Sequence, residues 1–177
     1  MPTRAVFLDR DGTLIEEAGY ANQLSMIKLF PYSVDAVRQL NLAGFTVVVI
    51  TNQAGISRGI VPEPFVAEAH AHLTRRLASG GATVDAYYYC PHHPDGVVAG
   101  LNIECECRKP KAGLWQRAAA DLGVDFLADR PPAPGAGPRR GGRGGGERRA
   151  RLLRSGAGRP PRDRPRFPAR PAAAHHL

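Results

Sequence analysis

The chain has 177 residues, a length that suits one domain with its own core, and we expect neither a signal peptide nor a membrane-spanning segment. Its net charge of +8 is uneven, because residues 1–130 carry 12 Lys and Arg against 14 Asp and Glu, whereas residues 131–177 carry 12 Arg against 2 acids. The first part therefore gives no electrostatic reason to expect nucleic-acid binding, and three cysteines argue against a secreted disulfide framework and favour the cytoplasm.

Hydrophobic patterning predicts strands that alternate with helices. Continuous apolar runs predict three buried strands, at residues 4–8, 45–50 and 85–90. Helical periodicity predicts three helices, one between the first two strands and the others at 63–78 and 114–122. The first helix is expected to have Ser33 as its N-cap and to end at Gly44. This order predicts an α/β domain with a parallel sheet covered on both faces.

The composition changes after Asp125. Residues 131–177 contain 9 Pro, 9 Gly and 12 Arg, too little apolar surface to offset chain entropy, so we expect a disordered tail. A GC-rich gene read out of frame would give this composition, and we hypothesise that the native frame is lost between Asp125 and Pro131. The folded domain is accordingly expected at residues 1–130. RNA binding by the tail is the weaker alternative, because Phe167 is its one aromatic residue for base stacking.

Two carboxylates, Asp9 and Asp11, directly follow the first predicted strand in the stretch FLDRDGTL. Open α/β sheets bind ligands at the carboxyl ends of their strands, and two acids at this spacing can share Mg²⁺ with phosphate oxygens. A calcium EF-hand does not fit, because Leu14 and Tyr20 stand where that loop needs Gly and Glu. By itself the motif is also compatible with a solvated turn.

Two further polar stretches favour a phosphate site. Thr51, Asn52 and Gln53 follow the second predicted strand, which places a hydroxyl and two amides at the same edge of the sheet. Arg108-Lys109-Pro110-Lys111 supplies cations that can neutralise a phosphoryl group. Each stretch alone is compatible with a polar turn or a basic surface patch, but their order along one chain favours the phosphate site.

A Cys/His cluster is a second signal. Cys90-x-His92 and Cys105-x-Cys107 offer three thiolates and one imidazole, a complete tetrahedral zinc set that leaves no open position for water. We therefore expect a structural zinc that fixes the loop between the two pairs. His93 is the rival ligand, and three unliganded cysteines are the alternative.

In the order FLDRDGT, VITNQ and CRKPKAG, these motifs resemble the haloacid dehalogenase superfamily of phosphatases. More narrowly, with GYANQ, LFP, TNQAGISRG and YYCPHHP, residues 5–125 resemble the D-glycero-D-manno-heptose 1,7-bisphosphate 7-phosphatases and the histidinol-phosphatases. The resemblance implies a Rossmannoid three-layer sandwich with a minimal cap and a zinc-binding loop, incomplete at its carboxyl-terminal part here. It implies a monomeric, Mg²⁺-dependent phosphatase for a small phosphorylated sugar, with no membrane or nucleic-acid partner. A non-catalytic, zinc-stabilised binding module is the competing class.

The resemblance also implies a role for each motif residue. Asp9 would be the nucleophile and Asp11 the proton donor and acceptor, with Mg²⁺ held by the Asp9 side chain and the Asp11 backbone carbonyl. Thr51 and Lys109 would hold the phosphoryl oxygens. Substrate contacts are expected from Arg10, Glu17, Gly19, Tyr20, Asn52, Gln53 and Arg108. The family's C-x-H pattern favours His92 over His93 as the zinc ligand.

The family also needs a further acid for Mg²⁺, in a motif beyond Asp125. The dipeptide Asp129-Arg130 comes too early and follows no apolar strand, so we do not assign it. Without this acid, Mg²⁺ affinity and turnover are expected to fall by orders of magnitude, which would make the chain a catalytically impaired copy.

Overall fold

The computed structural model describes residues 4–124, so the predicted tail, its disorder and the hypothesised loss of frame lie outside the described residues and stay predictions. The elements come in this order: β1 (Ala5–Leu8), the 3₁₀ helix η1 (Leu24–Met26), α1 (Ser33–Leu42), β2 (Thr46–Asn52), α2 (Glu63–Ser79), β3 (Ala86–Cys90) and α3 (Gly113–Leu122). The alternation of strands and helices confirms the predicted α/β class.

The three strands form one parallel sheet in the order β1-β2-β3. Phe7 of β1 pairs with Val48 of β2, and Ile50 of β2 pairs with Tyr88 of β3. The central strand β2 is buried over Val47–Ile50, which explains why its sequence is a continuous apolar run instead of an alternating one. Parallel pairing brings the carboxyl ends of all three strands to one edge of the sheet.

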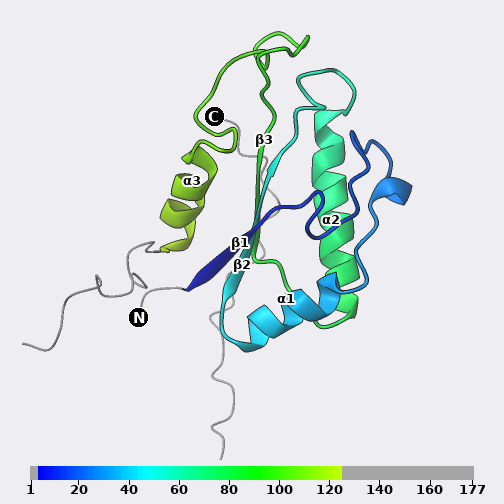
Figure 1. The fold of residues 1–177 in the computed structure, drawn as a ribbon, viewed down its shortest axis with the longest axis vertical. Coiled ribbons are helices and arrows are strands. Elements are labelled where there is room, and N and C mark those ends of the chain that lie inside the picture. Colours follow the sequence, from blue (N-terminus) through cyan, green and yellow to red (C-terminus); the bar gives the residue numbers. More distant parts are fainter. Residues whose placement is uncertain (1–3, 125–177) are drawn as a thin grey trace, which may run out of the picture. The chain divides into compact units, whose positions relative to one another are not determined.

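Alternate side chains of β2 enter two separate cores. Val47 and Val49 pack with the buried faces of α1 and α2, whereas Val48 and Ile50 pack with β3 and α3. The helices α1 and α2 thus cover one face of the sheet and α3 covers the other, as Figure 1 shows. This arrangement is the three-layer sandwich that the resemblance implied.

Two local predictions were wrong. Ser33 is the first residue of α1 and not its N-cap, because its buried hydroxyl donates to the carbonyl oxygen of Leu14 at 2.7 Å, and Tyr32 occupies the cap position. The strand β2 continues to Asn52, so Thr51 and Asn52 belong to the strand and do not follow it. The second prediction failed because the strand was recognised by its apolar run, and the polar Thr51 and Asn52 at its carboxyl end do not continue that run. The helix end at Gly44 is confirmed by its φ of +83°.

No helix within residues 4–124 is long and apolar enough to cross a membrane.

Candidate functional site

The chain turns sharply after β1 and presents the two predicted carboxylates. The carbonyl oxygen of Arg10 accepts the N–H groups of Leu14 and Ile15, at 3.0 and 3.1 Å. Gly12 adopts a φ of +72°, a left-handed conformation that favours glycine and explains its place in the motif. As a result, the Asp9 side chain is 45 % exposed at the edge of the sheet, and the Asp11 side chain is 18 % exposed.

Lys109 pairs directly with Asp9. Its Nζ lies 2.6 Å from Asp9 Oδ2 and donates to the carbonyl oxygen of Ile50 at 3.0 Å. The backbone N–H of Arg10 donates to the other carboxylate oxygen, Asp9 Oδ1, at 2.8 Å. The ammonium group is therefore fixed between β1 and β2, beside the carboxylate that was predicted to be the nucleophile.

The Asp11 carboxylate accepts hydrogen bonds from three side chains. Thr51 Oγ1 donates to its Oδ2 at 3.1 Å, and Gln53 Nε2 donates to the same oxygen at 2.9 Å. Arg10 binds both oxygens, through Nε to Oδ2 and Nη2 to Oδ1, each at 3.1 Å. Thr51, Gln53 and Arg10 are all buried, so this carboxylate has a fixed orientation.

The residues predicted to bind substrate fall into two groups. The first group forms hydrogen bonds with other protein groups in this structure and consists of Arg10, Asn52, Gln53 and Arg108. Arg108 Nη1, for example, donates to the carbonyl oxygen of His92 at 3.3 Å. The second group lies in the loop between β1 and η1 and consists of Glu17, Gly19 and Tyr20. In this loop the Gly19 N–H donates to Glu17 Oε1 at 3.0 Å. The Tyr20 ring is 42 % exposed. The substrate contacts stay predictions.

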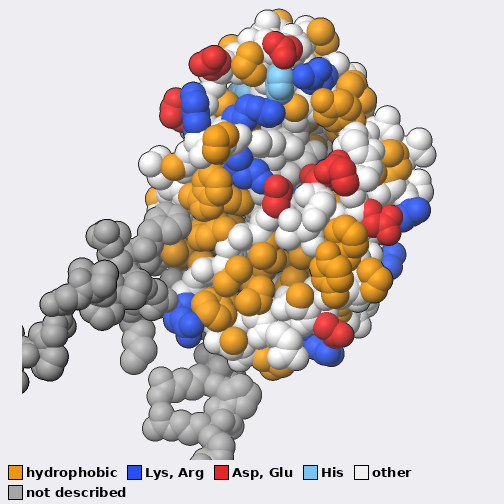
Figure 2. Space-filling view, in the orientation of Figure 1, with side chains coloured by type: hydrophobic (Ala, Val, Ile, Leu, Met, Phe, Trp, Pro, Cys, Tyr) orange, Lys and Arg blue, Asp and Glu red, His pale blue; other side chains and the backbone are white. Residues whose placement is uncertain are grey.

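Charged side chains gather near this edge of the sheet. Figure 2 shows Lys, Arg, His and acidic side chains toward the upper part of the view, over the loop that follows β3, with apolar side chains more frequent lower down. Lys109 pairs with Asp9 and Arg10 pairs with Asp11, so a cation accompanies each of the two carboxylates. Such a balance can bind an anionic phosphoryl group beside a carboxylate nucleophile.

The carboxylate oxygens of Asp9 and Asp11 are ligands of the kind that Mg²⁺ prefers. Within residues 4–124, however, no third acid joins them to form a cluster of three metal-binding side chains. The two carboxylates thus fit Mg²⁺ by their chemistry. The prediction that a further acid is needed concerns residues beyond 124, which lie outside the described part of the chain.

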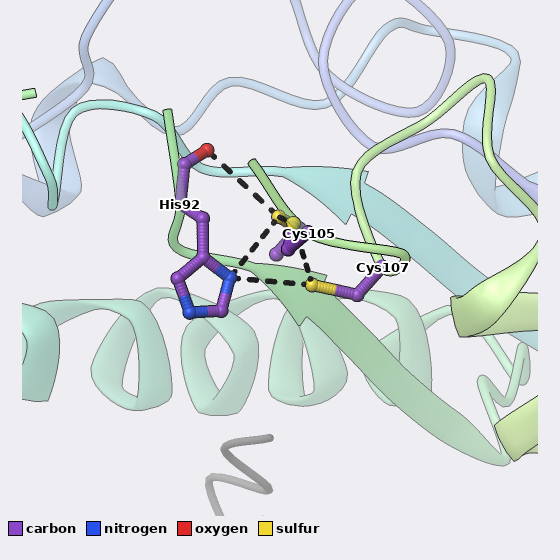
Figure 3. A group of neighbouring side chains, drawn as sticks. His92, Cys105 and Cys107 are labelled. Atoms are coloured by element: carbon purple, nitrogen blue, oxygen red, sulfur yellow. Dashed lines mark hydrogen bonds between the residues drawn. The ribbon is translucent and has the colours of Figure 1, made fainter. Parts of the chain in front are cut away.

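The second centre is the Cys/His cluster, drawn in Figure 3. The Sγ atoms of Cys90, Cys105 and Cys107 and a ring nitrogen of His92 all lie within 4.8 Å of one another. The Cys90–Cys105 and Cys105–Cys107 sulfur distances are 3.5 and 3.2 Å, and His92 Nδ1 is 3.3 Å from Cys107 Sγ. Tetrahedral zinc with Zn–S bonds of about 2.3 Å places its sulfurs about 3.8 Å apart. The donor set fits zinc, and the sulfur atoms, which lie 3.5 and 3.2 Å apart, would have to separate slightly to reach this spacing.

Two of the three free thiols in this cluster, those of Cys90 and Cys107, resist ionisation without a cation, whereas hydrogen bonds from these two thiols outweigh partial burial and lower the pKa of Cys105. Burial raises the pKa of Cys90, and burial together with the neighbouring thiols raises the pKa of Cys107. A bound divalent cation would reverse this preference, because it stabilises thiolates.

His93, the rival ligand, lies elsewhere: its Nε2 is 3.4 Å from Arg58 Nη2, and its Nδ1 accepts the Asp95 N–H at 3.1 Å.

The sequence reasoning missed His70, which lies on α2. His70 Nε2 is 3.5 Å from Arg10 Nη1, and the imidazole is buried. The signal was present in the sequence, because position 70 falls four residues after Val66 and three before Leu73, on the buried face of the helix. A polar side chain buried at such a position needs a hydrogen-bonding partner, because its burial otherwise costs free energy.

Comparison with known proteins places these features in a family. Residues 4–129 match the family model described as polynucleotide kinase 3 phosphatase. A D-glycero-beta-D-manno-heptose-1,7-bisphosphate 7-phosphatase from Yersinia pestis is 40% identical over 124 residues, which cover 70% of this chain and 66% of the relative. The enzyme of the same name from Escherichia coli K12 is 39% identical over 124 residues, covering 70% and 65%. The chain therefore spans slightly less than two thirds of the length of these relatives.

Two solved structures resemble the fold. A D,D-heptose 1,7-bisphosphate phosphatase from B. bronchiseptica, complexed with magnesium and phosphate, aligns with a TM-score of 0.61 and 34% identity, over 70% of this chain and 65% of its own. A protein described as a HAD-like phosphatase from Mesorhizobium loti aligns with a TM-score of 0.67 and 35% identity, over 70% of this chain and 59% of its own.

Proposed function

The chain belongs to the polynucleotide kinase 3 phosphatase family, which confirms the resemblance to haloacid dehalogenase phosphatases, and from this premise we propose that it hydrolyses a phosphomonoester through an aspartyl-phosphate on Asp9. The observation that carries the proposal is the contact of 2.6 Å between Lys109 Nζ and Asp9 Oδ2 at the carboxyl edge of a parallel sheet. A cation in this place can hold a phosphoryl oxygen next to the attacking carboxylate.

In the first step, an Asp9 carboxylate oxygen attacks phosphorus while the bond between phosphorus and the leaving oxygen breaks. Asp11 enters this step as the protonated carboxylic acid and gives its proton to that leaving oxygen, which departs as an alcohol and leaves Asp11 as a carboxylate. Lys109 and the Thr51 hydroxyl stabilise the charge on the phosphoryl oxygens. The fixed orientation of Asp11, held by Thr51, Gln53 and Arg10, supports a role in proton transfer because such catalysis depends on geometry.

In the second step, Asp11 accepts a proton from water as that water attacks phosphorus. The bond between phosphorus and Asp9 breaks, inorganic phosphate leaves and the carboxylate is regenerated. Splitting the displacement in two lets one carboxylate, Asp11, act first as acid and then as base.

Mg²⁺ would be held by the Asp9 side chain and the Asp11 backbone carbonyl, whereas the further acid that the family uses is not assigned in this chain. When bound, it would offset the repulsion between the carboxylates and an incoming phosphate. The magnesium and phosphate of the B. bronchiseptica neighbour support this assignment.

For the substrate we propose the 7-phosphate of D-glycero-D-manno-heptose 1,7-bisphosphate. The names of the Yersinia pestis and Escherichia coli relatives support this choice over histidinol phosphate. Arg108, held close to the active-site edge by its contact with the His92 carbonyl, is the residue that we propose for recognition of the second phosphate.

For the Cys/His cluster we propose a structural zinc ion. It would fix the loop that carries Arg108 and Lys109, because Cys107 directly precedes these two residues. The tetrahedral donor set and the buried thiols support this role.

The test is phosphate release by the full chain in Mg²⁺, with heptose bisphosphate and histidinol phosphate as separate substrates. We expect faster release from the heptose bisphosphate and loss of release in the Asp9→Asn variant. Faster release from histidinol phosphate would reverse the choice of substrate. Absence of release from either would favour a zinc-stabilised binding module or a truncated copy that is catalytically impaired.

A further inference from the structure

We propose that His70 is a positioning residue for Asp11, which it reaches through the guanidinium group of Arg10. The inference rests on the proposed function, since it assigns His70 a part in the proton transfer of that reaction. His70 touches neither the Asp9 carboxylate nor Lys109 in the contacts described, so any effect on turnover acts through Arg10.

The first observation is how completely Arg10 is engaged. Its Nε and Nη2 each donate to Asp11 at 3.1 Å, and its remaining nitrogen, Nη1, lies 3.5 Å from His70 Nε2. Arg10 is only 3 % exposed. Because the guanidinium group is planar and rigid, an acceptor that fixes Nη1 on one side also fixes the fork that holds Asp11 on the other.

The second observation concerns the proton on His70. Arginine stays protonated and can only donate, so His70 Nε2 must be the acceptor and the ring proton must lie on Nδ1. Burial, and then the charge of Arg10, lower the pKa of His70 to about 3. The imidazole is therefore neutral under all conditions in which a phosphatase would work, and it remains an acceptor for Arg10.

The third observation is that the imidazole is itself held in place. Its ring stacks on the ring of Tyr87 with centroids 4.5 Å apart and an angle of 17°, and Tyr89 meets it edge-on at 6.1 Å. Both tyrosines belong to β3, and Tyr89 Oη donates to Glu63 Oε1 at the start of α2. A continuous set of contacts thus runs from β3 through His70 and Arg10 to the proposed acid/base.

A leucine at position 70 would suit the buried face of α2, whose neighbours Val66, Leu73 and Leu77 are apolar. It would also avoid the cost of burying a polar ring. A histidine at this position is therefore explained by its acceptor atom, which an apolar residue lacks. The competing explanation is that His70 only satisfies the buried Arg10 and has no effect on proton transfer.

The first experiment does not depend on turnover. In ¹⁵N NMR of the full chain, we expect His70 to show the neutral ring with the proton on Nδ1 from about pH 5 to 8. We also expect slow rotation of the Arg10 guanidinium group, which becomes fast in His70→Leu and stays slow in His70→Gln, because the amide of glutamine can replace Nε2 as acceptor. A protonated ring, or unchanged Arg10 rotation in His70→Leu, would overturn the inference.

The second experiment separates positioning from stability by varying the leaving group. An alkyl phosphate needs a proton from Asp11, whereas 4-nitrophenyl phosphate releases a stable anion that does not. For His70→Leu we expect kcat/KM, which reports the steps up to formation of the aspartyl-phosphate and not the later attack of water, to fall roughly tenfold on heptose bisphosphate but less than about threefold on 4-nitrophenyl phosphate. His70→Gln should recover most of the loss, and His72→Leu, the same change two residues along α2, is the control.

Equal losses on both substrates would assign His70 a purely structural role and overturn the inference. Absence of turnover in the unmutated chain would count against the proposed function of this copy, and the NMR result would then decide the inference by itself.

Discussion

The side-chain amide of Asn52 hydrogen-bonds both the N–H and the carbonyl oxygen of Lys109. Its Oδ1 accepts the Lys109 N–H at 3.0 Å, and its Nδ2 donates to the Lys109 carbonyl oxygen at 3.2 Å. This pair of bonds joins the end of β2 to the loop that follows the Cys/His cluster. The place of the Lys109 ammonium group beside Asp9 therefore depends on a side chain 57 residues earlier in the chain.

We expect Asn52→Leu, which keeps the size but removes both hydrogen bonds, to lower kcat roughly tenfold with KM changed less than about threefold, because Lys109 loses its position. Steady-state phosphate release measures both constants. The sequence prediction that Asn52 binds substrate makes the opposite forecast, a raised KM with kcat preserved, so the two explanations can be told apart.

The Lys109→Met variant removes the charge and keeps most of the side-chain volume. We expect kcat to fall by roughly 10²–10³-fold, the loss typical of a missing group that stabilises developing charge. Lys111→Met is the matched control, since its ammonium group pairs with Glu106 Oε1 in an exposed position. Comparable losses in the two variants would contradict a specific role for Lys109.

The Cys/His cluster should bind one zinc ion per chain. We expect Cys107→Ala to lose the metal, measured by elemental analysis, and to lower the Tm by roughly 10 °C or more, because the loop it fixes has little core of its own. His93→Ala should keep the full metal content, since His93 contacts Arg58 and lies outside the cluster. Loss of zinc in His93→Ala would instead identify His93 as a zinc ligand.

Acid should destabilise the protein through His70. The native ring has a pKa of about 3, whereas the unfolded chain takes up this proton below about pH 6.5, so the unfolded state binds more protons between these values. The free energy of unfolding should therefore decrease as the pH falls through this window, by about 1.4 kcal/mol per pH unit.

Urea unfolding of the native chain and of His70→Gln measures this effect. The difference in the free energy of unfolding between the two should change by about 2 kcal/mol from pH 7 to pH 5, in favour of His70→Gln at the lower pH. Other groups titrate alike in both chains and cancel. Parallel pH profiles would show that His70 is not a buried neutral base.

The reading frame is open to a direct check. DNA sequencing across codons 120–140 is expected to find an insertion or deletion between the codons of Asp125 and Pro131. A frame-restored protein should bind Mg²⁺ more tightly and release phosphate faster, because it would regain the missing acid. An intact frame would remove the hypothesis, whatever the activity of the chain.

Several features could be predicted from the sequence because they depend on local pattern. The apolar run of Val47–Ile50 indicates a strand buried on both faces, and Gly44 marks the end of a helix. The spacing of Cys90, His92, Cys105 and Cys107 already contains a complete ligand set, so the structure had only to bring the two pairs together.

The partners of the polar side chains were decided by the tertiary structure. Ser33 suits an N-cap by residue type, yet its hydroxyl donates to the Leu14 carbonyl oxygen, and the residue type of Asn52 does not reveal that its amide bonds the Lys109 backbone. Each partner is distant in sequence, and hydrophobic periodicity says nothing about which distant atom a polar group will face.

Arg10 and His70 show the same division. Arg10 stands between two carboxylates in the sequence, and helical spacing from Val66 and Leu73 puts His70 on the apolar face of its helix, although it was not singled out from the sequence. Only the packing of α2 against β3 and of the turn after β1 brings the guanidinium and the imidazole within 3.5 Å. The physical reason is burial: once water is excluded, each polar group must take the nearest partner that the folded chain provides.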